Sequence, residues 1–359
     1  MTYCNKVTLM CLVIIAIAVP LATIGAHAQE VSVYARGLDG PRGLKFGPDG
    51  HLYVAEAGRG GPQNPCLVVP IVGPYHGGPT ARISKIVDGQ RITVVDGLPS
   101  AMSSLPTGDT LGAADVAFLG SKLYGLIAGG GCTHGNPQDP PGVIRADVDR
   151  GTWDYIVDLG LFMKTHPVEN PNPADFEPEG TLYSMVEHKG HFYAVEPNHG
   201  QVIKITPGGH AEQLIDISAT QGHAVPTAMA FHDGAFYVGT LNTFPIQPGS
   251  ATVLKISETG ELLDVMHGFT AVTGLTFDGK GRMYVEELSA APGFPMPGAG
   301  KIVRVGGSGQ IEDFWTGLNV PTGLTYHDGA LYISNFGAVP ASVGSELGEI
   351  LRVTIPDEP

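Results

Sequence analysis

The sequence predicts an all-β fold, a six-bladed propeller of four-stranded blades. The first observation is internal repetition, because one apolar phrase containing a tyrosine returns six times along the 359 residues. The marker tyrosines are 71, 69, 44, 47 and 48 residues apart: Tyr53, Tyr124, Tyr193, Tyr237, Tyr284 and Tyr332. Repeats of roughly 40–50 residues built from short strands are typical of propeller blades. The second observation is the 51 Gly and 29 Pro, which disfavour a helical protein.

Each copy of the phrase predicts the first two strands of a blade, A and B. The first copy spans residues 43–56 and reads G-L-K-F-G-P-D-G-H-L-Y-V-A-E. Two further segments with alternating apolar residues follow, as in 301–305 and 310–315. A period of two broken by Gly-rich turns is the pattern of antiparallel strands and hairpins. Each blade is therefore expected to hold four strands, A to D, from the inside outward.

The last copy stops early, and the beginning of the chain supplies what it lacks. Residues 349–353 read as strand C of the sixth blade, and the sequence ends soon afterwards. Residues 31–41 resemble 311–321, which form a strand D and the turn after it. We expect the mature N-terminal strand to join the last blade, because closing the ring removes exposed sheet edges. Residues 29–359 are thus expected to form a single propeller domain.

Residues 1–28 have the pattern of a secretory signal peptide. Lys6 precedes an apolar run over 7–19, and 26–28 read A-H-A, a cleavage pattern. Cleavage is expected before Gln29, with a secreted or periplasmic location. An uncleaved membrane anchor is the alternative, although the run is short for a span. After cleavage we expect no membrane span and a monomeric protein.

Cleavage would leave two cysteines, Cys66 and Cys132. Both fall in the loops after strand B, one in blade one and one in blade two, and neighbouring blades present these loops side by side. An exported chain meets an oxidising compartment, where an even pair of cysteines tends to bridge. The sequence therefore predicts a Cys66–Cys132 disulfide.

Charge and loop length indicate what the chain binds and where. The formal net charge is −15, so nucleic acid is not an expected partner. The A–B and C–D turns are tight, whereas the connections on the opposite face are long, apolar and proline-rich. The long connections are 57–80, 129–141, 159–181, 241–250, 288–299 and 336–346. Long loops in a compact domain usually carry function, so a small molecule or protein partner is expected there. The alternative is a lid of loops packed on each other.

Strand A is expected to begin where strand B ends, so polar residues at these positions should meet at the channel mouth. The candidate ligand-binding residues are Arg42, Glu56, Asp115, Glu196, Asn198, His199, Thr227, Glu287 and Asn335. Glu56, Glu196 and Glu287 are candidate ligands for a divalent cation such as Ca²⁺, which prefers oxygen ligands. A general acid–base pair and a purely structural network are the alternatives. No other cofactor is indicated.

Two further sequence patterns bear on possible chemistry. The acidic segment 169–180 reads as a solvated loop, with metal binding as the alternative. Neither H-E-x-x-H nor G-x-S-x-G is present, so no catalytic residue can be assigned.

The chain resembles the ScyD/ScyE family of exported six-bladed propellers. The resemblance rests on the leader, the phrase over residues 37–58, the E-P-N-H-G of 196–200 and the closing P-T-G-L. It covers essentially the whole mature chain and implies a non-enzymatic accessory role, with an apolar metabolite or a protein as the partner. The later repeats are shared with TolB-like and NHL-like propellers.

The nearest enzymatic alternative is a metal-dependent hydrolase or lactonase of the gluconolactonase-like class. Such propellers place an acidic residue or Asn at the strand A starts to hold a divalent metal. The corresponding residues here are Arg42, Ala114, Thr227, Thr273 and Thr322. Only Asp115, one position further on, is acidic. The departure favours the binding role over the lactonase.

Overall fold

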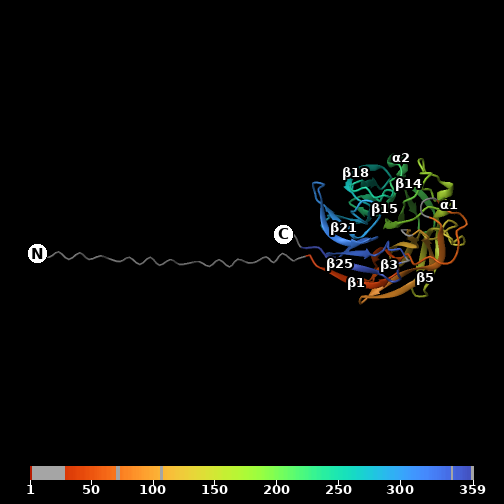
Figure 1. The fold of residues 1–359 in the computed structure, drawn as a ribbon, viewed down its shortest axis with the longest axis horizontal. Coiled ribbons are helices and arrows are strands. Elements are labelled where there is room, and N and C mark those ends of the chain that lie inside the picture. The colour runs from red at the N-terminus through yellow and green to blue at the C-terminus, as the bar shows by residue number, and fades with distance from the viewer. Residues whose placement is uncertain (2–28, 70–72, 106–107, 341–342, 357–359) are drawn as a thin grey trace.

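Six antiparallel sheets surround a central channel in the computed structural model, which describes residues 1, 29–69, 73–105, 108–340 and 343–356 (Figure 1). The fold is the six-bladed propeller that the repeats predict. The expected signal peptide lies, apart from Met1, outside the described residues. Within the described ranges, no helix is long and apolar enough to cross a membrane.

The strands follow one another around the ring in chain order. Blade one holds β2 (Pro41–Phe46), β3 (Leu52–Glu56), β4 (Tyr75–Val87), β5 (Gln90–Ser103) and β6 (Thr110–Leu111). Blade two holds β7 (Ala113–Leu119), β8 (Lys122–Ile127), β9 (Gly142–Asp147) and β10 (Thr152–Asp158). Blade three holds β11 (Ser184–His188), β12 (His191–Glu196), β13 (Gln201–Ile205) and β14 (Ala211–Asp216).

The second half of the ring repeats the same order. Blade four holds β15 (Pro226–His232), β16 (Ala235–Thr240), β17 (Ala251–Ser257) and β18 (Leu262–Phe269). Blade five holds β19 (Val272–Phe277), β20 (Met283–Glu287), β21 (Pro297–Val305) and β22 (Ile311–Asn319). Blade six holds β23 (Leu324–His327), β24 (Ala330–Asn335), β25 (Gly348–Thr354) and β1 (Val31–Leu38).

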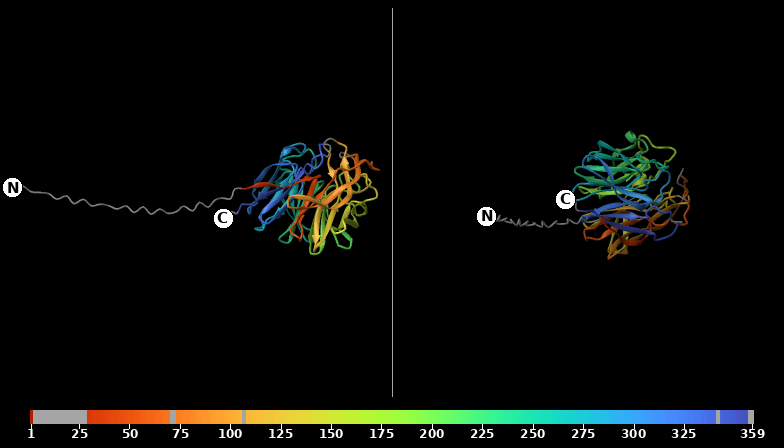
Figure 2. Two further views of the ribbon diagram at one scale, coloured as in Figure 1. Left: turned by 90° about the horizontal axis from the view of Figure 1, so that it is seen from below. Right: turned by 60° about the vertical axis from the view of Figure 1, so that its left-hand side comes forward.

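The two ends of the chain meet in blade six. Strand β1 pairs antiparallel with β25, from Val31 opposite Val353 to Leu38 opposite Gly348. Next to this pair, Thr354 N donates to Glu30 O at 2.9 Å. The red β1 lies alongside the blue C-terminal strands in Figure 2. The outer strand of the last blade therefore comes from the opposite end of the sequence.

Blade one differs from the expected four strands. Residues 75–80, expected in a loop, belong to β4, and β6 pairs with the far end of β5 as a fifth strand. This long hairpin reaches the second blade: a Cβ on Gly77 would lie 2.4 Å from Gly135 O. The close backbone contact requires glycine, and it joins the blade-one hairpin to the long loop of blade two.

Two short helices occur in the connections that follow the outer strands of blades two and three, α1 (Leu159–Thr165) and α2 (Ser218–Gln221). The Asp158 carboxylate caps α1 by accepting from Leu161 N at 2.8 Å. Phe162 and Met163 bury the inner side of α1 between blades two and three. Tertiary burial thus stabilises a helix that is too short to persist alone.

The core lies between neighbouring blades, where apolar side chains of facing sheets interdigitate. Tyr124 of blade two packs on Phe192 of blade three, with ring centroids 4.5 Å apart. Tyr284, a marker tyrosine, is fully buried between blades five and six. Burial of such side chains supplies the main stabilisation, and it fixes each sheet relative to the next.

Candidate functional site

Side chains at the starts of the A strands form a ring of hydrogen bonds around the channel. In blade one, Arg42 Nη2 donates to Thr110 O at 2.5 Å. The other bonds join each blade to the next: Met185 N to Asp115 Oδ2 (2.8 Å), Ser184 Oγ to Thr227 O (2.6 Å), Thr227 Oγ1 to Val272 O (2.6 Å), Thr273 Oγ1 to Pro321 O (3.0 Å) and Thr322 Oγ1 to Pro41 O (2.6 Å). Asp115 and Thr227 therefore hold neighbouring blades together, whereas Arg42 joins the start of β2 to β6 within blade one. Both roles support the structural interpretation of these residues.

Side chains at the ends of the B strands have a second shared role. Each accepts a hydrogen bond from the backbone of the connection that enters its own blade. The bonds are Asp39 N to Glu56 (2.7 Å), Thr181 N to Glu196 (2.8 Å), Thr270 N to Glu287 (2.9 Å) and Asn319 N to Asn335 (2.7 Å). Buried carboxylates that accept backbone N–H groups anchor the loop, and Glu287 Oε2, which has no hydrogen-bond partner, lies 3.7 Å from Lys301 Nζ.

The three glutamates expected to bind a cation are not brought together. Glu56, Glu196 and Glu287 belong to blades one, three and five, and each is held within its own blade. Among the described residues, no group of three or more His, Cys, Asp or Glu side chains could hold a metal ion. The three glutamates therefore do not form the one cation site that was expected in the described residues, because backbone N–H groups and basic side chains already contact their carboxylates.

Asn198 and His199 fix the acidic segment 169–180 to blade three. The Glu196 carboxylate accepts from Asn198 N and His199 N at 3.0 and 2.7 Å. Asn198 Oδ1 accepts from Glu177 N at 2.7 Å, and His199 Nε2 lies 2.8 Å from Glu177 O. Glu177 is only 3% exposed, so this segment is not a solvated loop at that position.

Glu177 forms a buried pair with His134, which the sequence did not single out. His134 Nε2 lies 2.9 Å from Glu177 Oε2, and Nδ1 lies 2.6 Å from Gly130 O. Both ring nitrogens thus face acceptor atoms. The His134–Glu177 pair therefore carries one more proton than a neutral imidazole beside an ionised carboxylate would carry. Burial alone would lower the pKa of His134, but the hydrogen bond and charge of Glu177 outweigh it and raise the pKa.

The residues beside His134 tie the same loop to two others. Cys132 is joined to Cys66 as expected, with Cα atoms 5.3 Å apart. Thr133 N and Oγ1 both donate to Glu179 Oε2. The other carboxylate oxygen of Glu179, Oε1, accepts from Lys164 Nζ at 2.8 Å. Over blades one to three, the long loops therefore pack on each other, as the lid alternative predicts.

A small cavity lies in the channel, lined in part by Asp115, Tyr183, Thr273 and Thr322. Burial raises the pKa of Asp115, although Lys45 and the N–H groups of Met185 and Val116 oppose the shift. Because this carboxylate already accepts from two backbone N–H groups, its polar atoms serve the fold.

Glu286 lies behind the wall of this cavity and was not predicted as a site residue. Its Oε1 is 3.0 Å from Thr273 Oγ1, and its Oε2 is buried without a hydrogen-bond partner. Ala55 and Val195 take the corresponding position in blades one and three. A carboxylate at a position where the copies in blades one and three have an apolar residue is the sequence signal that could have identified Glu286.

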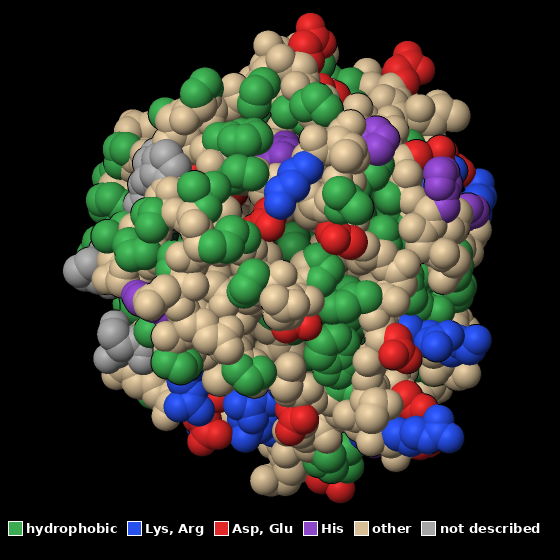
Figure 3. Space-filling model, turned by 90° about the vertical axis from the view of Figure 1, so that its right-hand side faces the viewer, with side chains coloured by type: hydrophobic (Ala, Val, Ile, Leu, Met, Phe, Trp, Pro, Cys, Tyr) green, Lys and Arg blue, Asp and Glu red, His purple; other side chains and the backbone are tan. Residues whose placement is uncertain are grey.

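The rim of the long-loop face carries exposed apolar side chains from four blades. They are Leu67, Val68, Phe244, Phe294, Met296, Val343 and Leu347. Figure 3 shows one side of the molecule, on which many hydrophobic side chains are exposed and charged side chains of opposite sign lie beside each other, both near the centre and toward the margins. Exposed apolar groups collected at loop tips mark a surface that can exclude water on contact with a partner.

Removing one bond from the ring of hydrogen bonds around the channel is expected to lower the stability of the folded protein. Thr322→Val keeps the shape of the side chain but takes the 2.6 Å hydrogen bond away from Pro41 O, so we expect the free energy of unfolding to fall by about 1–2 kcal/mol. Chemical denaturation measures the change. The control Thr152→Val lies on the exposed face of β10 and should change stability by less than about 0.5 kcal/mol. Equal stability of Thr322→Val and the unmodified protein would contradict the proposed role of the ring.

Comparison with known proteins identifies the fold but no family. No family model matches the chain, and no curated protein matches it. The structure is similar to a putative glucose dehydrogenase from Thermus thermophilus, with a TM-score of 0.57, 17% identity, and 90% and 99% of the two chains covered. It is similar to a protein of unknown function from Bacteroides thetaiotaomicron, with a TM-score of 0.56, 12% identity and 91% and 76% coverage.

A gluconolactonase from Xanthomonas campestris is a further structural neighbour. Its TM-score is 0.54, its identity is 11%, and the alignment covers 92% of this chain and 91% of that one. Likeness at such low identity shows a shared propeller fold and does not transfer an activity.

Proposed function

We propose that the protein is an exported, non-enzymatic binding propeller of the ScyD/ScyE type. It holds an apolar small molecule or a protein partner on its long-loop face. The proposal rests on one observation above the others, a pair of exposed aromatic side chains on adjoining loops of blades four and five.

The aromatic pair consists of Phe244 and Phe294, with ring centroids 5.9 Å apart and ring planes inclined by 27°. The two side chains are 44% and 55% exposed. Beneath them, the loops are joined by two backbone bonds, Ile246 N to Gly293 O at 2.6 Å and Gly293 N to Ile246 O at 3.0 Å. The two loops are therefore held together before binding, which lowers the entropy cost of association.

The loops that carry these rings contain no Asp, Glu, Lys or Arg over 241–250 and 288–299. The absence of charge from these segments is notable in a chain with a net charge of −15. A partner that meets this surface is selected by apolar contact and shape. Planar apolar groups can pack against the exposed ring faces.

The metal-dependent hydrolase is not favoured by any observation in the described part of the chain. Glu56, Glu196 and Glu287 are separated and serve the backbone, and Asp115 links blades two and three. We therefore retain binding as the proposed function.

A neutral fluorescent apolar probe tests the proposal. We expect the purified protein to bind Nile red, and the double variant Phe244→Ser/Phe294→Ser to lose at least about tenfold in affinity, equivalent to about 1.4 kcal/mol. Fluorescence titration measures both. Leu263→Ser is the matched control, because Leu263 is 50% exposed on β18 but lies outside the long loops.

The control should bind Nile red as the unmodified protein does. If the double variant also binds the probe with unchanged affinity, the aromatic pair is not the binding surface, and the proposed function fails at this site.

A further inference from the structure

The buried contact between His134 and Glu177 depends on one extra proton. His134, in the long loop of blade two, is fully buried, and Glu177, in the connection that enters blade three, is 3% exposed. Nδ1 of His134 lies 2.6 Å from Gly130 O, and Nε2 lies 2.9 Å from Glu177 Oε2. Carbonyl and carboxylate oxygens are acceptors, so each of the two contacts needs a proton of its own. A neutral imidazole supplies only one of the two.

Loss of the extra proton leaves the pair with no favourable arrangement. If the remaining ring proton stays on Nδ1, the lone pair of Nε2 faces the ionised carboxylate of Glu177 at 2.9 Å. If the proton moves to Nε2, the lone pair of Nδ1 faces Gly130 O at 2.6 Å. A buried acceptor that faces another acceptor is costly, and because the pair is buried, water replaces the lost donor only after the loops separate.

The charged groups on the blade-three side favour the protonated pair. Burial opposes an imidazolium at His134, but its hydrogen bonds and the charges of Glu177 and Glu179 outweigh burial and raise its pKa above the usual 6.5. The basic groups on this side point elsewhere: Lys164 Nζ donates to Glu179 Oε1 at 2.8 Å, and His199 Nε2 donates to Glu177 O at 2.8 Å. The imidazole therefore faces negative charge.

On the blade-one side, a tyrosine closes the site. Tyr75, the first residue of β4, packs its ring edge-on against the imidazole, with ring centroids 5.1 Å apart. Burial raises the pKa of Tyr75 well above its usual range, and the charges of Glu177, Asp109 and Asp175 add to this shift while Arg42 opposes it. Tyr75 thus stays neutral while the imidazole titrates, and the change in charge falls on the pair.

The disulfide decides which of the two loops is free to move. Cys132, two positions before His134, is cross-linked to Cys66 of blade one, so the loop 129–141 stays with that blade. The segment 169–180 carries Glu177, contains no cysteine, and forms neither helix nor strand. Segments held by few backbone hydrogen bonds open locally at low free energy. Separation of the pair therefore releases the segment 169–180.

We propose that the His134–Glu177 pair is a pH-sensitive lock, which holds the segment 169–180 against the blade-two loop and releases it as the pH rises. The proton that leaves goes to solvent, and no covalent bond changes. Because the closed form binds this proton more tightly than the open form does, the lock is complete below the ordinary histidine pKa of 6.5 and is lost as the pH rises through the raised value.

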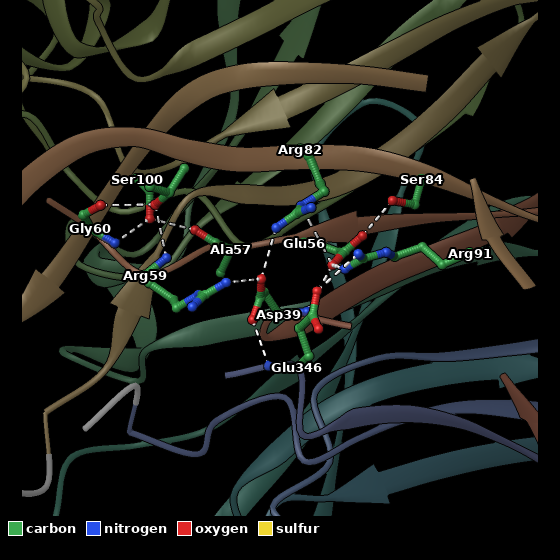
Figure 4. A network of polar contacts seen from close by, with 11 residues as sticks. Asp39, Glu56, Ala57, Arg59, Gly60, Arg82, Ser84, Arg91, Ser100 and Glu346 are labelled. Carbon is green, nitrogen blue, oxygen red and sulfur yellow. Dashed lines mark hydrogen bonds and ion pairs between the residues drawn. The ribbon is translucent and has the colours of Figure 1, made fainter. Parts of the chain in front are cut away.

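Another buried charge cluster, where blades one and six meet, contains no histidine (Figure 4). Asp39 Oδ2 accepts from Arg59 at 2.9 Å and from Arg82 at 2.7 Å, and Arg91 lies 3.5 Å from Glu56. Guanidinium groups do not lose their protons in proteins, so these carboxylates keep their partners as the pH rises. The cluster is an internal reference that should not open with the lock.

Glu177→Gln tests the lock, because glutamine has nearly the shape of glutamate but needs no extra proton. Its amide N–H donates to Nε2, while His134 keeps a single proton on Nδ1 for Gly130 O. Hydrogen exchange at pH 6, 7.5 and 9, corrected for the intrinsic effect of pH on exchange, measures opening of residues 130–139 and 169–180. Between pH 6 and 9, we expect protection in the unmodified protein to fall at least about tenfold relative to Glu177→Gln, the change for one pH unit of a one-proton transition.

The matched control is Asp175→Asn, which alters another histidine contact of the same segment. Asp175 Oδ2 lies 2.9 Å from His223 Nε2, and both side chains are partly exposed. This variant should keep the pH-dependent loss of protection, and the amides around Asp39 should show none of it. A flat profile in the unmodified protein, an equal decline in Glu177→Gln, or a decline abolished by Asp175→Asn would overturn the proposal. The last result would assign the pH response to His223.

Discussion

Replacing Cys66 and Cys132 with serine is expected to lower the free energy of unfolding by about 4 kcal/mol. The two cysteines are separated by 66 residues, and a cross-link closing a loop of that length removes much conformational freedom from the unfolded chain. The Cα atoms lie 5.3 Å apart, and Cys66 N donates to Cys132 O at 3.0 Å, so the two loops remain adjacent without the bridge. The loss therefore comes mainly from the unfolded state.

Guanidinium denaturation of the oxidised protein, the reduced protein and the double serine variant measures this effect. The reduced protein and the variant should unfold at the same, lower midpoint. The structure of the blade-two loop should be preserved, because Thr133 and His134 still bond to Glu179 and Glu177. Alkylation of both thiols in exported protein that was never reduced would contradict the disulfide.

Glu286→Gln is expected to stabilise the protein by about 3 kcal/mol at pH 7. Burial raises the pKa of Glu286 to about 8, and the Thr273 hydroxyl and the Gly323 N–H oppose this shift only in part. Each unit of pKa shift corresponds to about 1.4 kcal/mol. The amide is close in shape to the carboxyl group but cannot ionise.

Hydrogen-bond geometry at Thr273 is compatible with a neutral Glu286. The single hydroxyl proton of Thr273 faces both Pro321 O and Glu286 Oε1, each at 3.0 Å. When Thr273 donates to Pro321, Glu286 must itself be protonated to bond the hydroxyl oxygen. When Thr273 donates to Glu286 instead, the carboxylate form is accommodated, so burial is what favours the neutral form.

The sign of the pH dependence follows from the raised pKa. Between the ordinary glutamate pKa of 4.5 and about 8, the folded protein binds more protons at this site than the unfolded chain does. Stability is therefore fully present below the ordinary pKa and falls as the pH rises toward 8. Glu286→Gln should remove this part of the decline.

Denaturation at pH 5, 7 and 8 tests the expectation. The difference between Glu286→Gln and the unmodified protein should grow with pH. Glu212→Gln removes an exposed carboxylate paired with Lys204 at 2.7 Å, so it should cause only a small change. Parallel pH profiles for Glu286→Gln and the unmodified protein would show that Glu286 is ionised in the folded state.

Much of the architecture can be predicted from the sequence because its determinants are local. A period-two apolar pattern fixes which face of a strand is buried, and Gly-rich turns fix where strands reverse. The likeness of 31–41 to 311–321 predicts β1 as an outer strand, and loop lengths separate the two faces. The adjacency of blades one and two places Cys66 near Cys132.

The roles of the polar side chains could not be predicted in the same way. Glu286 and Glu287 are neighbours in β20, yet one faces the blade-five and blade-six interface and the other accepts from Thr270 N. Glu177 reads as part of a solvated loop until the second-blade loop brings His134 against it. Such contacts join residues tens of positions apart.

The sequence by itself determined the repeated strands, the position of the long loops and the candidate cysteine pair. Only the tertiary structure decided that the channel-mouth glutamates bind backbone groups and that Phe244 and Phe294 form an exposed aromatic pair. The physical reason is that strand patterns arise from neighbouring residues, whereas a polar side chain takes its role from partners that the fold brings to it.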